Sequence, residues 1–209
     1  MAENRSIVYV DGFNLYYGAL RGGPYKWLDL AKYFSLLRND DELQHVRYFT
    51  AQIVGPTANN QSSYLLALET LPLVTIYLGK FKSKQIHCQV PGCAYNGNKR
   101  FSVPEEKRSD VNIAIHMLHD AYQNQCDRFV LVSGDSDLVP AINMIKAQFP
   151  KKQVIVYVPS RSPVRGAAVE LRSAADKDRS LPLALLKHAQ LPAKIADGSG
   201  GWIRKPASW

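Results

Sequence analysis

The sequence predicts an α/β fold whose central sheet is mainly parallel. Five short segments, rich in Val, Ile, Tyr and Phe and bounded by polar residues, Gly or Pro, have the composition of buried strands. Helical segments separate them, and strands that are apolar on both faces are typical of parallel sheets covered by helices. A length of 209 residues with 46% hydrophobic content is sufficient for one sizeable core. The expected strands are Ile7–Val10, Val46–Ile53, Val74–Leu78, Phe129–Val132 and Val154–Val158.

Four helices are predicted between these strands, and a fifth is expected from about Pro163. The four are Trp27–Leu37, Asn60–Leu71, Asp110–Gln123 and Leu138–Phe149. The third of them carries an apolar stripe at helical spacing, and Asp110 lies on that stripe one turn before Ile113. The rest of the stripe is Ala114, Met117 and Ala121. The polar residues of this helix are expected on a solvated face: Asn112, His116, His119, Asp120 and Gln123.

Two segments interrupt the alternation of strands and helices. Residues 80–103 are polar, carry "PGCAYNGNKR" at their middle, and predict an inserted hairpin or long loop. After Lys187 the Gly, Ser and Pro content predicts an extended tail. Because the tail contains two tryptophans and Ile203, we expect it to dock on the body or on a partner, which makes self-association through it a further expectation. The predicted division is therefore a domain over 1–187 and a docking tail over 188–209.

Carboxylates follow two of the predicted strands. Asp11 ends the first strand, and Asp135 and Asp137 follow the fourth on the loop "SGDSD". Ligands of open parallel sheets bind beyond the carboxyl ends of the strands, and a right-handed doubly wound sheet commonly places its first and fourth strands side by side. With Asp110 from the helix, these side chains are expected to gather at one edge. Each also has an ordinary role, as a turn residue or helix cap, and Asn14 could cap a short helix over 15–20.

A group of carboxylates at one edge predicts a divalent cation. Three or four packed together would repel, and at neutral pH at least one would hold a proton. A hard cation removes this penalty, and oxygen-only ligands favour Mg²⁺ or Mn²⁺. Such a centre can stabilise the charge that grows on a phosphoryl group. The group therefore predicts a metal-dependent phosphodiesterase.

Charge favours a polyanionic partner. The formal net charge is +8, and the excess of basic residues concentrates between residues 80 and 108. A local excess of this kind favours binding to phosphate groups. The basic residues there are Lys80, Lys82, Lys84, Lys99, Arg100, Lys107 and Arg108. A solvated surface is the alternative explanation of this charge. Tyr16 could stack on a base of single-stranded RNA, or pack in the core.

Three ordered blocks, "VYVDGFNLYYG", "EEKRSDVNIAIHML" and "FVLVSGDSDLVPAINMIK", resemble the signature blocks of NYN domain proteins in the PIN-like nuclease superfamily, most closely the LabA/DUF88 branch. The resemblance implies a PIN-like three-layer α/β/α sandwich and a metal-dependent ribonuclease that acts on single-stranded RNA. By position, Asp11, Asp110 and Asp135 match the metal-binding acids, Asp137 a further acidic position, and Asn14 the asparagine of the family name. Relatives commonly have Lys-Gly-x-Asp where this chain has Lys107-Arg108-Ser109-Asp110.

Other functions have weaker support in the sequence. A catalytically silent RNA-binding or regulatory module on the same fold is the main alternative. A haloacid-dehalogenase-type phosphatase lacks its second aspartate, because Phe13 occupies that position. A zinc site at His87, Cys88 and Cys93 lacks a fourth ligand. No apolar run is long enough for a membrane helix, and three cysteines without framework spacing predict a cytoplasmic protein.

Overall fold

Six strands form the central sheet in the computed structural model, which describes residues 4–161 and 169–209. Their order is β3-β2-β1-β6-β7-β8, and every neighbouring pair is parallel. The strands are β1 (Asn4–Asp11), β2 (Asp41–Thr50), β3 (Val74–Leu78), β6 (Arg128–Val132), β7 (Gln153–Val158) and β8 (Lys177–Ser180). The first and fourth predicted strands are β1 and β6, which lie side by side as expected.

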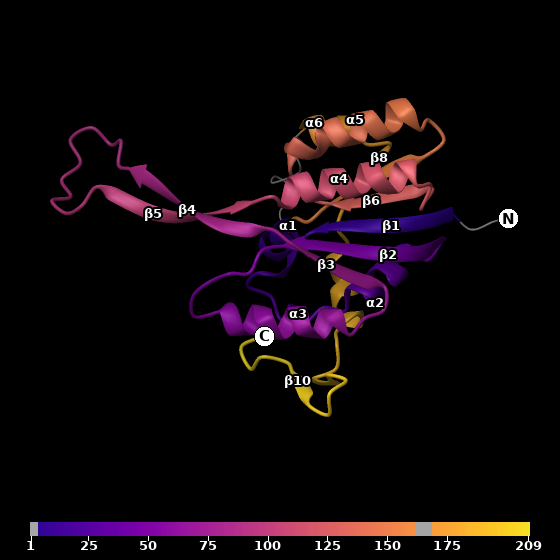
Figure 1. Cartoon of the computed structure of the whole chain (residues 1–209), viewed down its shortest axis with the longest axis horizontal. Coiled ribbons are helices and arrows are strands. Elements are labelled where there is room, and N and C mark those ends of the chain that lie inside the picture. Colours follow the sequence, from indigo (N-terminus) through magenta and orange to yellow (C-terminus); the bar gives the residue numbers. More distant parts are fainter. Residues whose placement is uncertain (1–3, 162–168) are drawn as a thin grey trace.

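Helices cover both faces of this sheet (Figure 1). One layer contains α4 (Ser109–Tyr122), α5 (Val139–Gln148) and α6 (Val169–Ala174), and the other contains α2 (Leu30–Leu37) and α3 (Ala58–Glu69). Alternate residues of β1 serve the two cores, because successive side chains of a strand point to opposite faces. Ile7 and Tyr9 pack in the cluster with α4, while Val8 and Val10 pack in the other. The PIN-like three-layer sandwich is thereby confirmed.

Strand and helix boundaries differ from the prediction by a few residues in most places. β2 begins at Asp41 and ends at Thr50, and α2 begins only at Leu30, where the Asp29 carboxylate accepts a hydrogen bond from the N–H of Lys32 at 2.9 Å. Residues 163–168 of the predicted fifth helix lie outside the described residues. The edge strand β8 was not predicted, because its sequence KDRS is polar and wholly exposed. Its place is fixed by backbone pairing to β7 rather than by burial.

The inserted segment is a long antiparallel hairpin, made of β4 (Lys80–His87) and β5 (Arg100–Lys107). It projects well away from the body (Figure 1). The hairpin prediction is confirmed, and the paired region extends to Lys107 rather than ending near residue 103. None of the helices within the described ranges is both long and apolar enough to cross a membrane.

The C-terminal segment packs against its own chain on the α3 side (Figure 1). It consists of the turn η3 (Leu183–His188) and the short antiparallel pair β9 (Lys194–Ala196) and β10 (Trp202–Arg204). Ile203 is buried, and the ring of Trp209 contacts Trp27 and Tyr64 at centroid distances of 6.3 and 5.5 Å. A boundary between domain and tail at Lys187 stays a prediction.

The prediction of a solvated position is wrong for one residue of α4. Asp120 is fully buried, and its carboxylate accepts two hydrogen bonds from Arg47 of β2, both at 2.8 Å, and one from the Tyr9 hydroxyl at 2.7 Å. The position is seven residues after Ile113, which is the spacing of the buried stripe. Its polarity suggested the solvated face, whereas the helical period places it under the sheet. His116 is likewise half-buried, and its ring lies 4.1 Å from that of Tyr77.

Candidate acidic active site

Asp11 ends β1 on the face that α4 covers, and it is buried. Its Oδ1 accepts a hydrogen bond from the N–H of Asn14 at 2.9 Å, so Asp11 is the N-cap of α1 (Gly12–Leu15). Asn14 therefore lies inside this helix and does not cap a later one. The chain continues as one π-helical turn, η1 (Tyr16–Leu20). Gly12 is required here, because a Cβ would lie 2.8 Å from the carbonyl oxygen of Phe49 and from the Tyr48 ring.

Asn14 joins the two acidic loops. Its Nδ2 donates to Oδ2 of Asp11 at 2.6 Å, and its Oδ1 accepts from the N–H of Gly134 at 3.1 Å. The register of β1 and β6 pairs Val10 with Val132, which brings Ser133 beside Asp11. The Ser133 hydroxyl donates to Asp11 Oδ2 at 3.1 Å and accepts from the N–H of Asp135 at 3.1 Å. Asn14 and Ser133 thus hold the Asp11 carboxylate and the loop of Asp135 in one arrangement.

Asp135 and Asp137 follow on the same loop. Oδ1 of Asp135 accepts a hydrogen bond from the N–H of Asp137 at 2.9 Å and caps the 3₁₀ turn η2 (Ser136–Leu138). Asp137 is exposed. The loop therefore presents Asp135 close to the buried Asp11, with Asp137 at the solvent edge.

Asp110 lies in the first turn of α4, which packs against β1, and it is half-buried. Its carboxyl has a pKa raised to about 6, first by burial and then by the negative charges of Asp135, Asp11, Glu106 and Asp137. The pKa of Asp11 is also raised, chiefly by burial, although its hydrogen bonds from Asn14 and Ser133 oppose the rise. Negative charge on the neighbouring acids therefore disfavours ionisation of Asp110 and Asp11.

Sequence reasoning missed two members of this environment. Glu106 adds a carboxylate, which accepts a hydrogen bond from the Ser109 hydroxyl at 2.7 Å. Its sequence context suggested only an opposing charge in the basic segment. Ser133 had no signal of its own except its place directly after a buried strand that pairs with the Asp11 strand.

The donor chemistry of these residues fits a divalent cation, because every candidate ligand is a carboxylate oxygen. Asp110 and Asp137 have the most capacity left, since neither carboxylate accepts a hydrogen bond from residues 4–161 or 169–209, whereas Asp11 and Asp135 both do. Across those residues, however, no three His, Cys, Asp or Glu side chains already form a group that could hold an ion. Coordination would therefore require side-chain rotation, for which exposed Asp137 and half-buried Asp135 have room.

The hairpin distributes the predicted RNA-binding residues over both of its faces. Directly opposed residues share a face, so the pairing of Lys80 with Lys107 and of Lys82 with Glu105 places these side chains together. Lys84 is on the same face, whereas Arg100 is on the other and Lys99 donates to the carbonyl oxygen of Cys93 at 3.1 Å. Glu105 pairs with Lys84 at 3.4 Å and Lys107 at 3.1 Å.

Tyr16 lies outside the acidic group, with its ring edge on Tyr17 at a centroid distance of 5.2 Å. Tyr17 stacks on Phe13 at 6.4 Å, and Phe13 meets Phe81 of the hairpin at 5.6 Å. Aromatic rings therefore run from α1 to the base of the hairpin. Phe81 is on the hairpin face opposite Lys80 and Lys82.

Arg108 has a left-handed backbone, with φ 87°. This conformation is unfavourable for a residue with a Cβ. We expect the free energy of unfolding of Arg108→Gly to exceed that of Arg108→Ala by up to about 1 kcal/mol. Both variants lose the same guanidinium, so urea denaturation of the pair isolates the backbone contribution. Equal stabilities would show that this backbone is unstrained.

Comparison with known proteins places the chain in a family. The family model described as NYN domain matches residues 5–182. Among curated proteins, 6-hydroxy-3-succinoylpyridine 3-monooxygenase HspA of Pseudomonas putida is 34% identical over 237 positions, which span 98% of this chain and 75% of the relative. A crystal structure of a protein of unknown function from Vibrio parahaemolyticus is similar with a TM-score of 0.54 and 19% identity, over 86% of this chain and 94% of that one. This last likeness concerns the fold.

Proposed function

Because the chain belongs to the NYN domain family, which has a PIN-like nuclease fold, we propose that it is a metal-dependent ribonuclease that hydrolyses phosphodiester bonds of mainly single-stranded RNA. The observation that carries the proposal is the arrangement of the acids: Asn14 binds both Asp11, at 2.6 Å, and the N–H of Gly134, at 3.1 Å, and so holds the Asp11 and Asp135 segments together where α4, which carries Asp110, packs on them. Acids gathered in this way at the carboxyl end of a parallel sheet are what a cation-dependent site requires.

Asp11, Asp110 and Asp135 would hold Mg²⁺ or Mn²⁺, and Asp137 would assist from the solvent edge. When bound, the cation supplies charge neutralisation at the phosphoryl group. Asn14 and Ser133 orient the Asp11 carboxylate by their hydrogen bonds of 2.6 and 3.1 Å. Since Asn14 also binds the N–H of Gly134, it keeps the Asp11 and Asp135 segments in register with one another.

The experiment is incubation of the purified protein with labelled single-stranded RNA, in Mn²⁺, in Mg²⁺ and in EDTA. Cleavage that requires the cation supports the nuclease. RNA that is bound and stays intact with every metal would favour the alternative, a catalytically silent RNA-binding module on the same fold.

The hairpin lysines are proposed to bind the RNA backbone. Lys80 and Lys82 share a face and have no carboxylate partner within the described residues. Replacing both by Ala should weaken RNA binding and flatten the slope of log affinity against log salt by about 0.7 for each phosphate that the variant no longer neutralises. The control is Lys151→Ala/Lys187→Ala, which removes two exposed lysines outside the hairpin. Equal slopes in the two double variants would indicate that the hairpin lysines only form a solvated surface and do not bind RNA.

A second candidate function follows from the Pseudomonas putida relative, whose name gives it as a monooxygenase of a substituted pyridine. The observation that favours it is that the similarity spans 98% of this chain, the acidic site included. The test is to supply 6-hydroxy-3-succinoylpyridine with O₂ and NADH as reductant, and to follow substrate loss by absorbance. Turnover of the pyridine without RNA cleavage would favour this candidate over the nuclease.

Three finer proposals accompany the nuclease. The LabA/DUF88 branch is proposed from the three sequence blocks. A cytoplasmic location is proposed from the cysteines, of which Cys88, Cys93 and Cys126 are all free thiols. Self-association through the tail is the weakest of these, because Trp209 packs on its own chain and leaves Trp202 as the exposed tryptophan of the tail.

A further inference from the structure

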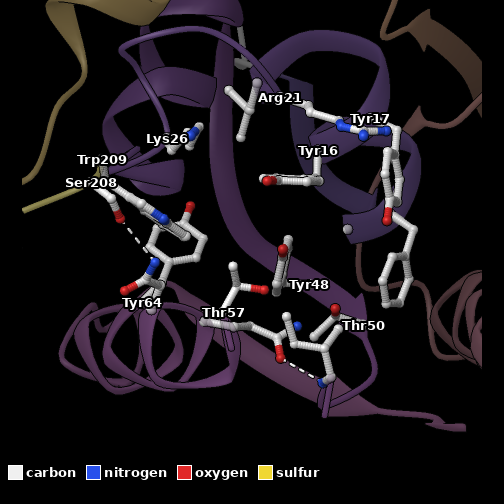
Figure 2. A pocket seen from close by; sticks show the side chains of 16 residues that line it. Tyr16, Tyr17, Arg21, Lys26, Tyr48, Thr50, Thr57, Tyr64, Ser208 and Trp209 are labelled. Carbon is white, nitrogen blue, oxygen red and sulfur yellow. Dashed lines mark hydrogen bonds between the residues drawn. The ribbon is translucent and has the colours of Figure 1, made fainter. Parts of the chain in front are cut away.

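A cavity, whose lining is drawn in Figure 2, lies on the face of the sheet opposite to α4. Gly12 and Phe13, which directly follow Asp11, form part of its lining, and Tyr48 of β2 lies in the core cluster of that face. Its volume is about 400 Å³, at the lower end of the range for small-ligand sites. Apart from Tyr16, whose stacking on RNA stays a prediction, the proposed RNA hydrolysis uses none of its lining residues.

Six aromatic side chains contribute to its lining, from four separate parts of the chain. They are Phe13, Tyr16 and Tyr17 of the continuous segment α1–η1, Tyr48 of β2, Tyr64 of α3 and Trp209 of the C-terminal segment. Figure 2 shows Tyr16 and Tyr48 across the cavity from Trp209 and Lys26. Rings of this kind favour an aromatic ligand, which gains stacked or edge contacts beyond its burial.

The charge of the cavity lining is positive. Arg21 and Lys26 contribute to it, and none of the described lining residues is Asp or Glu. Neither cation has a carboxylate partner in the described part of the chain. Five other arginines, Arg5, Arg38, Arg47, Arg128 and Arg172, pair with aspartates, whereas Arg21 does not. The Arg21 guanidinium lies instead over the Tyr17 ring, 5.2 Å from its centroid.

The remaining walls are held in place by hydrogen bonds. Gln61 accepts from the N–H of Ile53 at 2.8 Å and donates to the carbonyl oxygen of Ala51 at 2.9 Å. The Tyr64 hydroxyl donates to the Leu28 carbonyl at 2.8 Å, and Asn60 donates to Ser208 at 3.0 Å. The cavity is therefore formed before any ligand arrives, which lowers the ordering cost of binding.

From these observations we infer that the cavity is a binding site for a single planar ring that carries an anionic arm. The ring lies among Tyr16, Tyr48, Tyr64 and Trp209, and the anion is held by Lys26 and Arg21. Two sources have this chemistry: a nucleotide, free or at an RNA end, and a free aromatic carboxylate. The inference does not rest on the proposed nuclease activity, because it concerns a cavity on the other face of the sheet.

The experiment is isothermal titration calorimetry of the full chain at low salt. EDTA is present, so that phosphate cannot bind through a cation at the acidic group. The probes are two pairs that differ in charge: uridine 5′-monophosphate with uridine, and 4-hydroxybenzoate with 4-hydroxybenzyl alcohol. We expect saturable binding of at least one anionic probe and much weaker binding of its neutral partner. Whichever anion binds more tightly identifies the source.

Substitution then places the ligand in the cavity. Arg21→Gln/Lys26→Gln should weaken binding of the anion by about tenfold or more. Lys151→Gln/Lys187→Gln changes the net charge equally at exposed positions outside the cavity, and it should bind like the parent. Melting curves confirm that both variants are folded. Failure of the parent to bind either anion at millimolar concentration, equal binding of charged and neutral probes, or unchanged binding by the Arg21 and Lys26 variant would each overturn the inference.

Discussion

Asp120→Asn should lower the free energy of unfolding by about 3–5 kcal/mol, the scale observed when one partner of a buried ion pair is removed. The Asp120 side chain has no exposure, and the Arg47 side chain that it pairs with is 16% exposed. Burial alone would lower the pKa of Arg47, but its hydrogen bonds to Asp120 outweigh this and raise it. Without the carboxylate, a guanidinium would remain in the core with no compensating charge. Urea unfolding with linear extrapolation measures the loss.

The matched control is the double substitution Arg47→Met/Asp120→Leu. It removes both charges and fills the space with apolar atoms, so it should recover most of the stability that Asp120→Asn removes. Arg47→Met alone should be destabilising, because it strands the buried carboxylate. If the free energy of unfolding of Asp120→Asn stays within about 1 kcal/mol of that of the parent, the ion pair does not stabilise the fold as its geometry indicates.

Asp120 also marks a limit of sequence-based prediction. The helical period placed it with Ile113 and Met117 on the buried stripe, yet its charge favoured the solvated face. Its partner Arg47 is 73 residues away in the chain, so no local pattern reveals that the charge is compensated. Where period and polarity disagree, the period was the better guide to the position of the side chain.

The sheet could be predicted largely because its strands are buried on both faces. Apolar runs marked β1, β6 and β7, and the neighbouring positions of β1 and β6 followed from the usual order of right-handed doubly wound sheets. The strand β8 carries no such mark, since all four of its residues are exposed. It forms because β7 offers unpaired backbone groups, which is a property of the neighbouring strand rather than of its own sequence.

The acidic group could be predicted because its members follow strands that the sequence marks clearly, but the contacts that support it could not. Asp11 and Asp135 follow adjacent parallel strands, so their approach depends only on strand order. The contact of Ser133 with Asp11 depends on register, in which Val10 pairs with Val132. A shift of one residue would turn this hydroxyl to the other face. Register is set by packing across the whole sheet, and the short sequence blocks do not report it.

The largest expected effect on activity is that of Asp110→Asn, which should reduce metal-dependent RNA cleavage by roughly a hundredfold or more, the scale of an electrostatic stabiliser removed from a transition state. The amide lacks the charge that a hard cation requires. Asp11→Asn should reduce cleavage similarly, but it also disturbs the fold. Its amide N–H₂ would face donors from Asn14 and Ser133 that now bind the carboxylate at 2.6, 2.9 and 3.1 Å. Asp110 is therefore the cleaner test.

The stability of Asp110→Asn without metal should change in the opposite direction to its activity. The pKa of Asp110 is about 6 in the folded protein, against an ordinary value of 3.8, so the folded state binds this proton more tightly than the unfolded state. The ionised carboxylate consequently destabilises the fold above about pH 6, and this effect fades as the pH falls from 6 towards 4. In EDTA at pH 7.5 the variant should melt at a higher temperature than the parent, and the difference should shrink by pH 5.

The exposed substitution Glu170→Gln controls for net charge. Melting curves across this range, beside the cleavage assay in Mn²⁺, separate the two roles of Asp110. A variant that cleaves RNA as fast as the parent for each folded molecule would overturn its role as a metal ligand.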